Sequence, residues 1–276
     1  MPGAIDLFVN PNMSHGLTDP RYMKFNEVKD FYFKGGEDFF QDLEYDSLLK
    51  QMDEAGVDHS LLTLEACVPK DYILEFSRKN PERFSLCVQV DVNMGLDDIW
   101  AMEDLVKNEH VTCARVTPFV CDKPTTHPLY YPLYAKCCEL DLPVSMNTGI
   151  PGPRASAASQ DPMNLDVVCR DFPELRLIMC HGADPWWGVA IRLMIKYPNL
   201  YMMTSAWMPK YLPPEFVHFM NTRGQDKVMW ASDHPVLDMT RCLEGVDALE
   251  LRPGVREKYL YENARRVVLG ERNPPR

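Results

Sequence analysis

Short apolar runs alternate along the chain with longer segments in which apolar residues recur every three or four positions. The short runs are continuous rather than alternating, which is typical of parallel strands that are buried on both faces. The longer segments have helical spacing, and Gly56 is placed to end the first of them. The predicted strands cover residues 4–9, 60–64, 84–90, 111–116, 143–147, 177–180, 199–205 and 227–231. The predicted helices cover residues 45–55, 71–79, 96–107, 130–140, 165–171, 185–196, 214–222 and 255–269.

Strict alternation of strands and helices predicts a parallel sheet with right-handed crossovers. Eight such repeats in a chain of 276 residues match a (β/α)8 TIM barrel in size and count. An open, doubly wound sheet is the alternative, but no GxGxxG motif follows any strand, which disfavours dinucleotide binding. No break in composition suggests a second domain. We therefore predict one α/β barrel domain over residues 1–276.

The segment of about residues 13–42, after the first strand, has no clear periodicity. A loop of this length in a compact domain is usually functional or disordered. Its aromatic content argues against disorder: it includes Phe25, Phe31, Tyr32, Phe33, Phe39 and Phe40. Two interpretations stay open, a plug for one end of the fold and a lid over a pocket.

Composition limits the partners and the compartment. A net charge of −11 disfavours nucleic acid and anionic membrane surfaces as partners. The nine cysteines are an odd number without a CxxC pair, which favours a reducing compartment. The N-terminus lacks an apolar stretch long enough for a signal peptide or membrane span. These features predict a cytoplasmic protein.

Candidate chemistry lies where the strands end. In a barrel, the residues at the C-terminal ends of the strands face one basin. His181 follows the sixth strand and Asp233 follows the eighth, and Asp184-Pro185 has the pattern of an N-cap and a first helical position. We predict His181 and Asp233 as the catalytic pair. The candidates for substrate binding are Asn10, Arg115, Asn147, Trp186, Trp207 and His234.

Structural roles remain open for most of these binding candidates. Arg115 could pair with a carboxylate below the barrel mouth, and Asn10 and Asn147 could cap loop backbone. His234 could bond to the barrel rim, and Trp186 could pack a helix start. Aromatic residues and methionines are nevertheless dense after the first, fourth, sixth and seventh strands. This density predicts a wide apolar pocket for a small molecule with a ring system or a long acyl group.

Six motifs follow one another along the chain: Ile5-Asp6, Met52-Asp-Glu-Ala-Gly-Val-Asp58, Leu142-Pro-Val144, Cys180-His-Gly182, Ala231-Ser-Asp-His-Pro235 and Tyr261-Glu-Asn-Ala-Arg265. In this order they resemble the amidohydrolase superfamily, specifically its amidohydrolase-2 group. That group includes aminocarboxymuconate-semialdehyde decarboxylases, aromatic-acid decarboxylases and pyrone-dicarboxylate lactonases. The resemblance covers nearly the whole chain and implies a barrel enzyme, which the family suggests is a homodimer.

The departures from the family concern its metal ligands. The family's first-strand motif, Asp-x-His-x-His, is here Asp6-Leu-Phe-Val-Asn10, so Phe8 and Asn10 replace two histidine ligands. Asn147 stands where the fifth strand usually carries a histidine ligand, which leaves Asp233 as the one usual ligand present. A catalytic zinc site needs about three protein ligands. We therefore predict no metal and no other cofactor; a rebuilt site from His181, Asp233 and His234 is the alternative.

Without a metal, water keeps a high pKa, and a base must take its proton during attack. The resemblance implies acid–base roles for the two catalytic candidates: Asp233 as the base, and His181 as the acid or electrophile. The leading hypothesis is a metal-independent hydrolase of an activated ester, lactone or C–C bond in an apolar, cyclic carbonyl compound. The alternatives are a non-oxidative decarboxylase or other C–C lyase, and a catalytically inactive barrel that binds a ligand.

Overall fold

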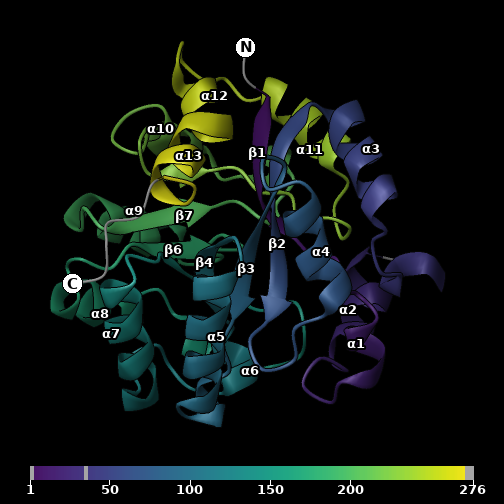
Figure 1. The fold of residues 1–276 in the computed structure, drawn as a ribbon. Helices are drawn as coiled ribbons and strands as arrows, with labels where there is room; N and C mark the ends of the chain where they lie inside the picture. Colours follow the sequence, from purple (N-terminus) through teal and green to yellow (C-terminus); the bar gives the residue numbers. More distant parts are fainter. Residues whose placement is uncertain (1–2, 34–36, 271–276) are drawn as a thin grey trace.

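The computed structural model describes residues 3–33 and 37–270 and contains a barrel of eight parallel strands alternating with helices (Figure 1). The sheet runs in chain order from the first strand to the eighth. Almost every strand position is buried, as expected for parallel strands covered by helices. The strands are β1 Ala4–Val9, β2 Val57–Glu65, β3 Phe84–Gln89, β4 Val111–Val116, β5 Val144–Asn147, β6 Leu177–Cys180, β7 Leu200–Met203 and β8 Val228–Met229.

The helices surround the strands and bury their apolar stripes against them. They are α1 His15–Thr18, α2 Phe25–Val28, α3 Tyr45–Ala55, α4 Asp71–Lys79, α5 Asp97–Asn108, α6 Pro118–Cys121, α7 Tyr131–Glu139, α8 Asn164–Asp171, α9 Trp187–Lys196, α10 Pro214–Met220, α11 Met239–Asp247, α12 Val255–Glu257 and α13 Asn263–Val267. The helix α3 ends at Gly56, which has a positive φ of 75° and leaves no side chain in the way of the turn. In the part of the chain that the structure describes, no helix is long and apolar enough to cross a membrane.

The barrel closes between β1 and the segment that follows β8. Val9 forms a parallel bridge with His234, and the backbone N–H of Asp233 donates to the carbonyl of Phe8 at 3.1 Å. One core cluster fills the space between strands and helices. A smaller cluster fills the barrel interior and includes Ala264 and Val267 of α13, the helix drawn at the end opposite α1 and α2 (Figure 1). The strand C-termini are therefore the end left for a site.

The predicted barrel fold is confirmed, with local corrections. The segment 13–42 is not a simple loop: it contains α1, α2, a π-helical turn Lys29–Phe33 and a 3-10 turn Glu37–Phe40. The helix α11 was not predicted, and the last predicted helix is interrupted by a π-helical turn, Lys258–Glu262. Asp184 does not cap α9, which begins at Trp187 after a cis Asp184–Pro185 peptide. Propensity could not show these features, because they depend on contacts with the barrel.

Candidate functional site

A cavity of about 640 Å³ opens at the C-terminal ends of the strands. Its floor carries ionisable and amide side chains from β4 and β5 and from the segments that follow β1, β6 and β8. Its walls are mostly apolar, and the segment 13–42 supplies several of the wall residues. Its polar lining residues include Asn10, Thr63, Gln89, Arg115, Asn147, His181 and Asp233. A mostly apolar cavity with a few converging polar groups is the usual form of a small-molecule site.

Asp233 lies at the closure of the barrel with its carboxyl group in the cavity. Burial raises the pKa of Asp233 to about 7, although the charge of Arg115 and a hydrogen bond from Asn10 both lower it. The Asn10 amide donates to Asp233 Oδ1 at 2.8 Å, while its own oxygen accepts from Thr63 at 2.9 Å. No described residue donates to Asp233 Oδ2. One oxygen of this carboxyl group is thus held by Asn10, and the other is available to a ligand or a water molecule.

Asp6 fixes the segment that carries Asp233. It is fully buried and accepts hydrogen bonds from the backbone N–H groups of Ser232 and Phe8, at 2.9 and 3.1 Å, and from the Ser232 hydroxyl. Burial raises the pKa of Asp6 to about 6 against these bonds, which lower it. The carboxyl group therefore joins β1 to the end of β8 at the point where the barrel closes.

The substitution Asp6→Ala is expected to destabilise the protein by about 3 kcal/mol, because it leaves several buried donors without an acceptor. Urea unfolding followed by circular dichroism would measure this change. Ser232→Ala, which removes one of the bonds, should cost clearly less. Equal losses in the two variants would contradict a central role for Asp6.

His181 follows β6 with a positive φ of 64°, which is unusual for a residue with a side chain. Two residues of the segment after β7 bond to its backbone: its N–H donates to the Ser205 hydroxyl at 3.0 Å, and its carbonyl accepts from Trp207 Nε1 at 2.8 Å. A side chain at Gly182 would come within 2.5 Å of Trp187, so only glycine fits after the histidine. Burial and the charge of Arg115 lower the pKa of His181 to about 3. The imidazole is therefore neutral, and its Nδ1 has no hydrogen-bond partner among the described residues.

Arg115 projects from β4 into the centre of the cavity floor. Its guanidinium carbon lies 4.0 Å from the centre of the Phe8 ring, and its Nη2 donates to Asn147 Oδ1 at 2.8 Å. Its Nε and Nη1 are buried without a hydrogen-bond partner. Among the described residues, Arg115 forms no ion pair, so the alternative of a carboxylate partner below the mouth is not seen. A buried cation with unused donors favours an anionic ligand.

The donor set does not fit a divalent metal of the family kind. The Phe8 ring, in place of a histidine ligand, contacts the Arg115 guanidinium at 4.0 Å and the His181 ring at 4.8 Å between ring centres. Asn147 Oδ1 already accepts from Arg115 and from the Cys180 thiol. A fixed positive charge at this place repels a second cation. Within residues 3–33 and 37–270, no group of three His, Cys, Asp or Glu side chains could hold a metal ion, so the alternative site with His234 is not assembled.

The cavity brings together most of the predicted site residues. Asn10, Arg115, Asn147, His181, Trp207 and Asp233 all line it. Trp186 and His234 do not line it: Trp186 directly precedes α9, and His234 forms backbone bonds with the end of β1. The cavity also contains Thr63, Gln89 and Tyr22, which sequence reasoning missed. Thr63 and Gln89 stand near the ends of β2 and β3, a position that could have identified them.

The family comparison agrees with this architecture. The protein has an eight-stranded parallel barrel with a cavity at the strand C-termini. This is the form of (β/α)8 barrels, whose active sites lie at that end. The amidohydrolase family model matches residues 31–269, and the chain belongs to that family. This confirms the family resemblance. No curated protein matches the chain.

Solved structures with the same fold cover the chain almost completely. An uncharacterized TIM-barrel protein from Bordetella bronchiseptica has a TM-score of 0.78 and 20% identity, with 96% of this chain and 97% of that chain covered. The 5-carboxyvanillate decarboxylase from Sphingomonas paucimobilis has a TM-score of 0.73 and 16% identity, over 98% and 100% of the two chains. The 2,6-dihydroxybenzoate decarboxylase from Rhizobium has a TM-score of 0.70 and 18% identity, over 97% and 98%.

Proposed function

We propose that this protein is a hydrolase that cleaves an activated lactone or ester of a cyclic, largely apolar compound without a catalytic metal. The observation that carries the proposal is the Asp233 carboxyl group. It lies in the cavity, its pKa is raised to about 7 by burial, and one of its oxygens is open. A base of this pKa suits proton transfer near neutral pH.

The proposed reaction begins when Asp233 takes a proton from a water molecule as that water attacks the carbonyl carbon of the substrate. The carbonyl oxygen becomes an oxyanion, which a neutral His181 N–H and the Asn147 amide can stabilise from the cavity floor. Arg115 holds an anionic oxygen of the substrate. When the intermediate collapses, the C–O bond breaks and the protonated Asp233 returns the proton to the leaving oxygen. The products are a carboxylic acid and an alcohol or phenol, so atoms and protons balance.

Asn10 has a different role from the substrate-binding one predicted from the sequence. Its amide nitrogen is engaged with Asp233 and its oxygen with Thr63. In this proposal it orients the base. His181 is likewise a hydrogen-bond donor rather than an imidazolium acid, because the pKa of its ring is lowered to about 3.

Non-oxidative decarboxylation is the second candidate, and the two similar decarboxylases favour it. Protonated Asp233 could deliver a proton to a ring carbon. The guanidinium argues against this candidate, because Arg115 stabilises a carboxylate in the ground state and so opposes its loss as carbon dioxide. The third hypothesis is an inactive barrel that binds a ligand. It does not explain why a carboxyl group with a raised pKa, Asp233, lies in the cavity.

The candidates separate in one set of incubations. We expect the protein to hydrolyse dihydrocoumarin, an activated aryl lactone, and to place one oxygen of ¹⁸O-labelled water in the product carboxylate. We expect no carbon dioxide from 2,6-dihydroxybenzoate or 5-carboxyvanillate. Release of carbon dioxide without lactone hydrolysis would replace the proposal by decarboxylation. No turnover of any of them, with retained binding, would favour the inactive barrel.

The pH dependence follows from the same carboxyl group. Because the base must be ionised and its pKa is about 7, kcat/KM for dihydrocoumarin should fall as the pH drops below 7 and level off above it. Steady-state rates between pH 5 and pH 9, corrected for spontaneous hydrolysis, would measure this limb. A rate that is constant down to pH 5 would mean that another group removes the proton.

A further inference from the structure

The guanidinium of Arg115 is held inside the barrel by side chains from other strands. Its carbon lies 4.0 Å from the centre of the Phe8 ring on β1, within the range of a cation–π contact. Its Nη2 donates to Asn147 Oδ1 on β5 at 2.8 Å, and the same oxygen accepts from the Cys180 thiol at 3.2 Å. Arg115 is only 6% exposed, and its Nε and Nη1 are buried. The cation is therefore a fixed part of the barrel interior.

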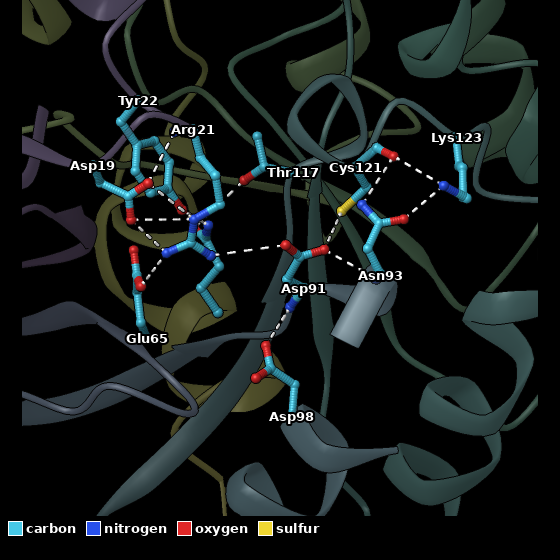
Figure 2. A network of polar contacts seen from close by, with 11 residues as sticks. Asp19, Arg21, Tyr22, Glu65, Asp91, Asn93, Asp98, Thr117, Cys121 and Lys123 are labelled. Carbon is cyan, nitrogen blue, oxygen red and sulfur yellow. Dashed lines mark hydrogen bonds and ion pairs between the residues drawn. The ribbon is translucent and has the colours of Figure 1, made fainter. Parts of the chain in front are cut away.

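Another guanidinium, at the ends of β2 and β3, is neutralised by carboxylates, as Figure 2 shows. This is Arg21, which lies 2.6 Å from Asp19, 2.7 Å from Glu65 and 3.7 Å from Asp91. Among the described residues, Arg115 has no such counter-ion, and its guanidinium contacts a ring and an amide oxygen instead. Burying a cation without a counter-ion costs folding free energy. A purely structural arginine would gain from carboxylates such as those around Arg21, so the uncompensated charge favours a role in the site.

The residues that contact this guanidinium stand at positions of the family's metal ligands. Positions 8 and 147 carry histidine ligands by the family resemblance, and here they are Phe8 and Asn147. Phe8 has no ligand atom for a metal, but its ring face attracts a cation, and the Asn147 oxygen accepts an N–H bond. The other two positions, Asn10 and Asp233, are bonded to each other at 2.8 Å. The side chains at these four positions thus suit a guanidinium better than a divalent metal.

We propose that the Arg115 guanidinium is the resident cation of this site and takes the place of the divalent metal that the family resemblance implies. The chain itself supplies the positive charge, and that charge repels a metal ion that is offered. The missing ligands alone therefore do not account for the exclusion of a metal. Restoring the ligands should not restore metal binding as long as Arg115 is present. This holds whether the reaction is hydrolysis or decarboxylation.

Restoring the ligands with and without the guanidinium tests the proposal. The triple variant Phe8→His/Asn10→His/Asn147→His carries the family's ligand types beside Asp233 and keeps Arg115. The quadruple variant adds Arg115→Leu, which removes the charge and supplies no ligand atom. Zinc binding is measured by calorimetry, and the visible spectrum after loading with Co²⁺ reports whether the metal is held by the protein. Circular dichroism checks that each variant is folded.

The matched control adds Arg154→Leu to the triple variant in place of Arg115→Leu. Arg154 is exposed and lies 3.4 Å from Glu27, so its loss changes the net charge equally but leaves the interior cation in place. We expect the quadruple variant to bind about one equivalent of Zn²⁺. The triple variant and the control should bind it at least about a hundredfold more weakly, because a charge a few ångströms away strongly repels a divalent ion.

Two results in folded variants would overturn the proposal. Zinc binding by the triple variant as tight as that of the quadruple variant would show that the guanidinium does not exclude a metal. Absence of zinc binding in the quadruple variant would show that the guanidinium does not stand in the metal's place. Neither result depends on turnover, so failure of this proposal and failure of the proposed hydrolysis are told apart.

A single substitution provides a second test that does not depend on the folding of the multiple variants. Arg115→Ala leaves the Phe8 ring and the Asn147 oxygen without their cation. Calorimetry should then show binding of free guanidinium in the millimolar range, and at least about tenfold weaker binding of urea, its uncharged planar counterpart. Adding Phe8→Leu should weaken guanidinium binding about threefold or more, the usual size of a cation–π contact. Equal binding of guanidinium and urea by Arg115→Ala would contradict a site built for a cation.

Discussion

Asp233→Asn is expected to lower kcat for dihydrocoumarin hydrolysis about a thousandfold, the usual contribution of a general base. The substituted amide keeps the shape of the side chain, and its oxygen can still accept from Asn10, but it cannot take a proton from water. The pH-dependent limb of kcat/KM should disappear with the carboxyl group. Stopped or continuous assays of phenol release would measure both effects.

Asp247→Asn is the matched control for this loss. Asp247 is exposed at the end of α11, where it pairs with Arg256 at 2.9 Å and lies outside the cavity. It should leave kcat unchanged. Circular dichroism of Asp233→Asn should show a folded barrel. Turnover retained in that folded variant would show that Asp233 is not the base.

Arg115→Met is expected to weaken benzoate binding about a hundredfold. The substitution removes a buried positive charge that would otherwise attract the carboxylate of benzoate. A second effect concerns the base. The charge of Arg115 lowers the pKa of Asp233, so its removal should move the limb of kcat/KM to higher pH. Calorimetry and the pH profile of lactone hydrolysis measure the two effects.

Arg115→Lys separates charge from geometry. An ammonium keeps the positive charge, so the limb should stay close to its original pH. It cannot donate to Asn147 and to a carboxylate with the fixed fork of a guanidinium, so benzoate binding should still be weakened. A pH limb that is unchanged in Arg115→Met would contradict the electrostatic link between Arg115 and Asp233.

Sequence patterns could predict residues of the candidate site only where they located the end of a strand. His181 and Asp233 follow apolar runs that end abruptly, so their place at one end of a barrel could be predicted. Thr63 and Gln89 stand near strand ends as well, but neutral residues within apolar runs give a weaker signal. Nothing in the sequence pointed to Tyr22, because the segment 13–42 has no periodicity. The course of this segment depends on the ion pairs of Arg21 with Glu65 and Asp91.

Adjacency in sequence also misled. His234 is next to Asp233, and Trp186 stands just after the His181 strand, so both were predicted to bind substrate. The positive φ of 75° at Asp233 turns the chain there, and the residue after it bonds to the end of β1 instead of lining the cavity. Trp207 lines the cavity and donates to the His181 carbonyl, a contact between the segments that follow β6 and β7 that no local pattern encodes.

The sequence by itself determined the architecture. Continuous apolar strands, amphipathic helices and their strict alternation leave few folds, because each element must bury its apolar face. It also determined that the usual metal ligands are missing, since that is a matter of residue identity. Tertiary structure decided the rest: that Arg115 fills the cavity floor with unused donors, that burial raises the pKa of Asp233 to about 7, and that Tyr22 reaches the site. These depend on distance and burial, which arise only when segments far apart in the chain are packed together.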